Sequence, residues 1–342
     1  MKNIKDYNLD ELKNELLVLG EKPYRAEQIF KWAYQENVTS FDEMSNLSLT
    51  LREKLKNNFT LCIFNILKKQ ESKKDETKKY LFDVLDGNAI ETVLMKYHHG
   101  YSLCVSTQIG CKMSCKFCAS TGLKFVRNLS SGEIIEQLLA VEREENIKIS
   151  NVVFMGIGEP LDNYENSVNA IKIINNPKGI NIGARHISIS TSGLVPYIYK
   201  LADENIQCTL SISLHATTDE KRSSMMPINN KYNIEELLRA CKDYTVKTNR
   251  RISFEYALAK DNNDNLEDAK KLASLLHGML CHVNLIPINK IENGNYVQSS
   301  NENIIKFRDY LNSKGIVATI RRELGSDIDA ACGQLRRKNL KK

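Results

Sequence analysis

Three cysteines within eight residues are the sequence feature with the clearest chemical meaning. Cys111, Cys115 and Cys118 form a CxxxCxxC pattern on one short segment. Structural zinc sites usually close four ligands around the ion, commonly as two CxxC or HxxxH pairs. Three thiolates on a compact loop can instead bind three irons of a [4Fe–4S] cube and leave the fourth iron open. A zinc knuckle completed by His98 or His99 is the alternative.

Polar or glycine-containing segments follow several apolar runs further along the chain. In Gly156-Ile-Gly-Glu-Pro160, the glycines let backbone approach a ligand and the carboxylate can accept from an ammonium group, although the motif also suits a tight turn. Hydroxyl groups at the end of a strand are often helix caps, and we expect this of Ser192. A lone histidine such as His215 is more often structural than functional. The remaining segments are Ser188–Gly193, Ser213–His215 and Asn284–Asn289, with Asn284 expected inside a strand.

Two further cysteines and one acid lie outside these segments. Cys104 precedes the cysteine pattern, Cys332 lies near the end of the chain, and Glu91 stands in Ile-Glu-Thr-Val. From residue types alone, Cys104 is a buried thiol, Cys332 is incidental and Glu91 is exposed on a strand, because free cysteine is among the most buried residue types.

Strand-like apolar runs recur from Tyr101 onward, with helical patterns between most of them. One helix is expected to begin at Ser130, which forms a capping box with Glu133. Strands that alternate with helices predict right-handed crossovers and a parallel sheet, so we expect the α/β class and a full or partial barrel. Barrel sites form at the carboxyl ends of the strands, where the segments above lie. The runs are 103–105, 152–155, 186–189, 210–214, 252–256, 283–286 and 317–320.

The pattern before residue 97 is different. Amphipathic helical segments fill the first sixty residues, and strand patterns then flank an Asp86-Gly87 turn signal. We therefore divide the chain into an accessory domain at 1–96, with an RNA-binding role, a barrel at 97–326 and a C-terminal segment at 327–342.

Composition limits the environment and the partners. The 342 residues include nine cysteines, and an odd, clustered set is better read as metal ligands or redox groups in a reducing compartment than as a disulfide framework. No stretch has the length or apolarity of a membrane helix or a signal peptide, so we expect a cytoplasmic protein without membrane contact. The net charge is +6, and basic side chains cluster at Arg336–Lys342 and in the pairs 68–69, 73–74 and 78–79. Such clusters can neutralise phosphates, although most are solvated faces.

The cysteine loop after the first barrel strand, with an aromatic residue before its last cysteine, resembles the radical S-adenosylmethionine enzymes. The resemblance implies a partial (β/α)6-type barrel and a [4Fe–4S] cluster on Cys111, Cys115 and Cys118. It implies that S-adenosylmethionine binds the open iron and that flavodoxin or ferredoxin supplies electrons for its cleavage to a 5′-deoxyadenosyl radical. The implied cofactor contacts are Gly158, Glu159, Ser190, Ser213, Leu214, His215 and Asn289.

The helical N-terminal region, Gly-Glu-Pro, Ser-Leu-His and the segment Asp329-Ala-Ala-Cys-Gly-Gln-Leu335 together resemble the RlmN/Cfr family of RNA adenine methyltransferases over essentially the whole chain. The resemblance implies that Cys332 carries the methyl group as S-methylcysteine and that Glu91 removes the ring proton. Cys104 would then attack Cys332 and release the product with a transient disulfide. Two molecules of S-adenosylmethionine are consumed per turnover, and a thiol reductant resets the enzyme.

The family has two branches. One methylates carbon 2 of adenine 2503 in 23S rRNA and of adenine 37 in tRNAs, and the other methylates carbon 8 of the same rRNA base. Gly158–Leu161 and Arg321-Arg322 resemble the carbon-2 branch, since the other branch typically has Ala where Pro160 stands. A function of another class, a non-catalytic RNA-binding protein stabilised by a metal, would explain the cysteine loop but leave Glu91, Cys104 and Cys332 without roles.

Loss of any one cysteine of the loop should abolish cluster binding. We expect Cys111→Ala, Cys115→Ala and Cys118→Ala each to lack the visible absorption of the cluster and to form no 5′-deoxyadenosine, because the site has no spare ligand. Iron and sulfide analysis with product chromatography tests this. A variant that reconstitutes normally and still cleaves S-adenosylmethionine would disprove the ligand assignment.

Overall fold

One large sheet organises the computed structural model, which describes residues 1–121, 124–289, 296–331 and 333–335. In these residues the sheet has ten strands in the order β14-β13-β12-β11-β10-β9-β6-β5-β4-β3. β6 and β9 to β14 are parallel, and β3, β4 and β5 extend the sheet as antiparallel strands. The strands are β3 (Asn65–Glu71), β4 (Lys78–Asp83), β5 (Ala89–Tyr97), β6 (Gly100–Cys104), β9 (Ile149–Phe154), β10 (Ile187–Thr191), β11 (Thr209–Ser213), β12 (Ile252–Leu258), β13 (Cys281–Pro287) and β14 (Ala318–Ile320).

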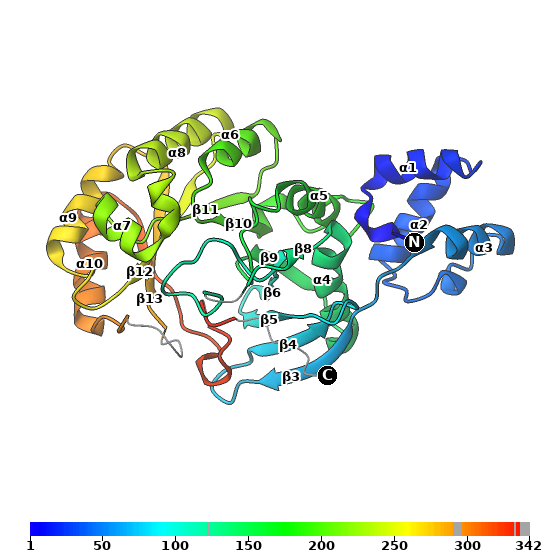
Figure 1. Ribbon diagram of the computed structural model, residues 1–342, viewed down its shortest axis with the longest axis horizontal. Helices are drawn as coiled ribbons and strands as arrows, with labels where there is room; N and C mark the ends of the chain where they lie inside the picture. The colour runs from blue at the N-terminus through cyan, green and yellow to red at the C-terminus, as the bar shows by residue number, and fades with distance from the viewer. Residues whose placement is uncertain (122–123, 290–295, 332, 336–342) are drawn as a thin grey trace.

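Helices connect the parallel strands and cover the outside of the sheet (Figure 1). Each predicted run overlaps one of these strands, so the α/β class is confirmed. The barrel is partial, because β14 and β3 lie at opposite ends of the strand order in the described residues. The helices are α4 (Ser131–Glu145), α5 (Tyr164–Asn175), α6 (Val195–Asp203), α7 (Asp219–Met225), α8 (Ile234–Thr248), α9 (Leu266–Leu275) and α10 (Asn301–Ser313), with short 3-10 turns at Ala184–His186, Pro227–Asn230 and Ser326–Ile328.

Local sequence sets the ends of these helices. α4 begins with the predicted capping box, in which Ser130 accepts the Glu133 N–H and the Glu133 side chain accepts the Ser130 N–H. It ends at Asn146 in the left-handed conformation (φ 51°), which asparagine tolerates better than most residues. No helix of the described residues has the length and apolarity needed to cross a bilayer.

β5 is buried on both faces, each against a different element. Side chains alternate along a strand, so Thr92 and Val93 face opposite ways. Thr92 donates to Gln137 of α4 (Oγ1 to Oε1, 2.7 Å). Val93 packs with Cys104 and with Leu324 from the C-terminal segment. The predicted domain boundary at residues 96 and 97 falls at the end of β5, where the sheet continues into β6.

The N-terminal helices form a separate layer beside α4 and α5 (Figure 1). Their contact with the barrel includes a buried ion pair, because Lys5 Nζ lies 2.5 Å from Glu136 Oε2 and both side chains are fully buried. Arg143 binds the other oxygen of Glu136. The elements are β1 (Lys2–Asn3), η1 (Ile4–Asp6), α1 (Leu9–Val18), α2 (Tyr24–Tyr34), η2 (Phe41–Glu43), α3 (Leu49–Asn58) and β2 (Phe59–Thr60).

Several lysines of the predicted basic clusters form ion pairs with carboxylates of the protein. Lys69 and Lys78 each lie 2.5 Å from a carboxylate oxygen of Glu145. Lys79 is buried and lies 3.5 Å from Glu91. These three ammonium groups are therefore paired with carboxylates instead of facing phosphates. The basic tail at 336–342 lies outside the described residues.

Removal of the buried Lys5 should destabilise the protein strongly. We expect Lys5→Met to lower the free energy of unfolding by about 3 kcal/mol, because Glu136 loses a buried partner. Lys2→Met is the matched control, since Lys2 pairs with Glu15 at the surface and its replacement should leave the urea midpoint almost unchanged. Urea denaturation measures both. Equal effects of the two substitutions would contradict the role of the buried pair.

Candidate active site

A cavity of about 220 Å³ opens at the carboxyl ends of the parallel strands. This is where barrel geometry places a site. Glu91 and Leu214 are not part of the lining, and Cys332 lies outside the described residues, although its chain neighbours Ala331 and Gly333 both line the cavity. The predicted site residues that line it are Cys104, Cys111, Cys115, Cys118, Gly158, Glu159, Ser190, Ser213, His215 and Asn289.

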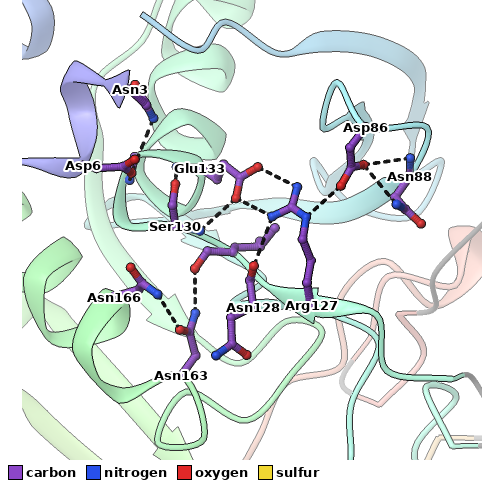
Figure 2. A network of polar contacts seen from close by, with 12 residues as sticks. Asn3, Asp6, Asp86, Asn88, Arg127, Asn128, Ser130, Glu133, Asn163 and Asn166 are labelled. Atoms are coloured by element: carbon purple, nitrogen blue, oxygen red, sulfur yellow. Dashed lines mark hydrogen bonds and ion pairs between the residues drawn. The ribbon is translucent and has the colours of Figure 1, made fainter. Parts of the chain in front are cut away.

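The cysteine loop is closed at its base by a short ladder between β7 (Gln108–Ile109) and β8 (Arg127–Asn128). Figure 2 shows Arg127 between Asp86 and Glu133: its Nε donates to Asp86 at 2.7 Å, and its two Nη atoms donate to Glu133 at 2.7 and 2.8 Å. A bidentate pair of this kind fixes orientation as well as distance. The loop therefore starts and ends at a rigid point beside the N-terminus of α4.

The tip of the cysteine loop is held by other parts of the site. Lys116 N donates to Met225 O of α7 at 2.9 Å. Ala119 N donates to Gly333 O at 2.6 Å, and the Ser120 hydroxyl donates to Leu335 O at 2.9 Å. Residues on both sides of Cys332 are thus near the loop: Ala331 lines the same cavity, and Gly333 bonds to the loop directly.

The buried thiols of the cysteine loop need a positively charged partner to be bound as thiolates. Burial raises the pKa of Cys111 to about 12, with smaller contributions from Glu159 and Cys118, and raises the pKa of Cys115 well above its usual value. Thiolates in this position therefore need a positive group, which an iron–sulfur cluster supplies. No three His, Cys, Asp or Glu side chains of the described residues converge on one ion, and a cube needs no such convergence because each thiolate binds a different iron. His98 and His99 lie before β6 and the loop follows it, so the zinc alternative is not supported.

The loop after β9 needs glycine for close packing. Gly158 has φ of 112°, and a Cβ there would lie 2.8 Å from Gln108 N and 2.7 Å from Gln108 Cβ. Glu159 is buried, and its two carboxylate oxygens accept the N–H groups of Leu161 (3.0 Å) and Ser192 (2.7 Å). Burial raises the pKa of Glu159, and these two N–H groups oppose the shift. Glu159 thus joins the loops after β9 and β10 at the cavity wall.

The loop after β10 differs from its prediction in one respect. Ser192 is not a helix cap: α6 begins at Val195 without a side-chain cap. Thr191 instead accepts the N–H groups of Gly193 (3.1 Å) and Leu194 (3.5 Å). Ser190 and Ser192 both line the cavity. Ser192 is the first residue after β10, at the strand end where the cavity opens, which the cap interpretation overlooked.

His215 is held neutral at the floor of the cavity. Burial lowers its pKa to about 3, with a smaller effect from Arg222. Its Nδ1 accepts the Ala257 N–H at 2.9 Å, which leaves the proton on Nε2. The ring contacts Phe117 of the cysteine loop edge-on, with centroids 4.7 Å apart. His215 therefore packs against the cysteine loop as a neutral ring.

Arg222 of α7 connects the strand ends that form the cavity. Its guanidinium is fully buried and donates to the carbonyls of Ser192 (2.7 Å), Ser213 (3.0 Å) and Leu214 (3.2 Å). Burial lowers the pKa of Arg222 to about 10, so the group stays charged at neutral pH. The Leu214 side chain lies in the core, and its backbone is bonded here and to Glu255. No motif pointed to Arg222, because three of its partners are backbone carbonyls, which any residue type can supply.

Glu91 lies beside the cavity, covered by the C-terminal segment. Glu91 is 1% exposed, and its carboxylate lies 3.5 Å from Lys79 Nζ. Leu324, Ile328 and Ala330 pack on the face of β5 that holds Val93. The prediction from residue types that Glu91 is exposed is therefore wrong, and the prediction that Cys104 is buried is confirmed.

Comparison with known proteins identifies the family. Residues 2–61 match the ribosomal RNA large subunit methyltransferase N-terminal domain, and residues 105–273 match the radical SAM superfamily. A probable dual-specificity RNA methyltransferase RlmN from Clostridium novyi is 56% identical over 98% of this chain and 98% of its own length. One from Clostridium botulinum strain Eklund 17B is 53% identical over 100% of this chain and 98% of its own length. This chain belongs to the RlmN family of radical S-adenosylmethionine RNA methyltransferases.

A solved structure agrees with the family assignment. The crystal structure of a radical SAM methyltransferase from Sphaerobacter thermophilus has a TM-score of 0.93 and 43% identity to this chain, and the match covers 98% of this chain and 99% of that one. The RlmN family works on RNA with a [4Fe–4S] cluster and S-adenosylmethionine. The loop thiols and the lined cavity fit these cofactors, and the non-catalytic RNA-binding alternative is set aside.

Loss of Arg222 should loosen the cavity. We expect Arg222→Met to lower the free energy of unfolding by about 3 kcal/mol and to weaken S-adenosylmethionine binding at least about tenfold, because three strand-end carbonyls lose their donor. Arg239→Met on the exposed face of α8 is the control and should change stability by less than about 0.5 kcal/mol. Denaturation and equilibrium dialysis of the reconstituted protein measure the effects. Wild-type binding by Arg222→Met would show that Arg222 does not shape the cofactor site.

Proposed function

We propose that this RlmN-family enzyme methylates carbon 2 of adenine 2503 in 23S rRNA and of adenine 37 in tRNAs. The observation that carries this proposal is the convergence of thiols on one cavity. Cys104 lines it together with the three cysteines of the loop and with both neighbours of Cys332. A methyltransferase that used only the cluster and S-adenosylmethionine would need neither Cys104 nor Cys332.

The proposed reaction uses thiol chemistry because carbon 2 of adenine is an electron-poor aryl carbon that does not attack a sulfonium methyl group. When bound, S-adenosylmethionine and the cluster supply a methyl group for a thiolate and a 5′-deoxyadenosyl radical that removes a hydrogen atom. Cys332 takes the methyl group on sulfur and releases its thiol proton. Loss of a hydrogen atom from this S-methyl group leaves a carbon radical, which forms a bond to carbon 2 of the adenine.

Glu91 and Cys104 complete the proposed reaction. Glu91 removes the ring proton from carbon 2, and the oxidised iron–sulfur cluster, when bound, would accept the one electron that the adduct loses. The Cys104 thiolate then attacks the Cys332 sulfur and breaks its bond to carbon, and the freed carbon takes a proton to become a methyl group. The disulfide between the two cysteines is reduced by an external thiol. Cys104 is cross-strand neighbour to Val93, two residues from Glu91 on the same face of β5, which supports this division of roles.

The carbon-2 assignment and the two RNA substrates rest on family resemblance. The relatives from Clostridium are named as dual-specificity RNA methyltransferases. Pro160 stands where the carbon-8 branch typically has Ala, and it lines the cavity. The proposed cofactors are one [4Fe–4S] cluster per chain and two molecules of S-adenosylmethionine per turnover, with flavodoxin or ferredoxin as electron donor. For Cys332, Glu91 and the predicted cofactor contacts, we propose the roles that the RlmN/Cfr resemblance implies.

The two working thiols should fail at different stages. We expect Cys332→Ala to give neither S-methylcysteine nor adduct, because the methyl carrier is absent. Cys104→Ala should form the carbon–carbon bond and then accumulate protein joined to RNA through Cys332, because only the releasing thiol is missing. Nuclease digestion followed by mass spectrometry of the Cys332 peptide measures the adduct.

Cys281→Ala is the control for this experiment, because Cys281 begins β13 at the end of the strand far from the cavity. It should turn over normally. Free methylated RNA without adduct from Cys104→Ala would show that Cys104 is structural and that another group releases the product.

A further inference from the structure

Lys79 of β4 is a buried cation that touches two parts of the site at once. Its side chain is 4% exposed, and its Nζ lies 3.5 Å from Glu91 Oε1. The same Nζ donates to the backbone carbonyl of Asp329 at 3.1 Å. One contact is to the strand that carries Glu91, and the other is to the segment that leads to Cys332. Lys79 therefore contacts both the proposed base, Glu91, and the segment that leads to the proposed methyl carrier, Cys332.

The register of the hairpin explains why Lys79 points to this face. Lys79 is paired with Val93, and Leu81 is paired with Glu91. Directly opposed residues of antiparallel strands share a face, so Lys79 lies diagonal to Glu91 on the face that turns toward the cavity. Its chain neighbour Lys78 points to the other face, where it binds Glu145 of α4.

The C-terminal segment docks on this face through apolar packing and through polar contacts at its edge. Ile328 and Ala330 pack with Val93 and Cys104. At the edge, the Asp327 carboxylate accepts from the Ser72 hydroxyl (2.7 Å) and from Lys73 N (2.8 Å). These edge contacts hold the segment on the turn between β3 and β4, away from Glu91. The contact of Lys79 with Asp329 ties the segment to the strand of Glu91.

We propose that Lys79 is a positioning residue that fixes the segment bearing Cys332 relative to Glu91. This inference rests on the proposed roles of those two residues. A buried ammonium group needs an acceptor and a counter-charge: the Asp329 carbonyl accepts its hydrogen bond, and the Glu91 carboxylate balances its charge. When the segment moves away, Lys79 loses one acceptor, so the position of the segment and the surroundings of the Glu91 carboxylate change together. Lys79 acts through the position of the segment and of the Glu91 carboxylate, and it takes no proton or methyl group itself.

The test compares Lys79→Met with Lys79→Arg and with Lys78→Met in the full-length, cluster-reconstituted enzyme. We expect Lys79→Met to raise amide hydrogen exchange of residues 325–331 at least about tenfold and to lower kcat for RNA methylation about 100-fold, with KM for RNA within about threefold. Lys79→Arg should restore most of the protection from exchange and most of kcat, because it keeps a hydrogen-bond donor and a positive charge. Lys78→Met removes the neighbouring charge on the opposite face and should leave both readouts within about twofold.

A second variant covers the case in which Lys79→Met does not fold. Lys79→Met combined with Glu91→Gln removes both charges of the buried ion pair, and it should fold and still show raised exchange at 325–331. Unchanged exchange in a folded variant, or unchanged kcat in Lys79→Met, would overturn the proposal. The exchange readout needs no chemistry. If exchange rises as expected while the wild-type enzyme methylates no adenine, the contact stands and the proposed function fails.

Discussion

The site depends on the burial of β5 on both faces. One face packs on α4 through Thr92, and the other holds Glu91 and Val93 beneath the C-terminal segment. Because side chains alternate along a strand, a shift of register by one residue would exchange these two sets. Glu91 would then face α4, and the thiol of Cys104 would lose its neighbours in the cavity. The pairing of β5 with β4 and β6 therefore fixes which groups can meet at the site.

Buried cations stabilise the loops around this arrangement. Arg222 gathers three carbonyls at the ends of β10 and β11, and Lys79 joins β5 to the C-terminal segment. Both side chains are buried, and both donate to backbone carbonyls of the segments that they join. The cysteine loop is held from two sides, by Met225 of α7 and by Gly333. The C-terminal segment is therefore bonded to the cysteine loop and, through Lys79, to the hairpin that carries Glu91.

The sequence predicted the repeating parts of the structure well. Apolar runs and helical patterns located the parallel strands, and the barrel rule located the site, because both follow from local periodicity. Lys79 and Arg222 were missed, since they bind backbone carbonyls, which leave no signature in residue types. The signal for Lys79 was present: a hairpin turn at Asp86-Gly87 pairs Lys79 with Val93, beside Glu91. Ser192 was misassigned because a hydroxyl before a helix suggests a cap, and only the structure shows that α6 starts later.

The fate of the methyl hydrogens tests the central claim most directly. RNA is incubated with the enzyme and with S-adenosylmethionine that carries a trideuterated methyl group, and the modified nucleoside is analysed by mass spectrometry. Passage through S-methylcysteine predicts methylation at carbon 2 with two deuterium atoms in the product methyl group, because one is abstracted and a proton replaces it on release. A product that retains all three deuterium atoms would show direct transfer and would contradict the role of Cys332.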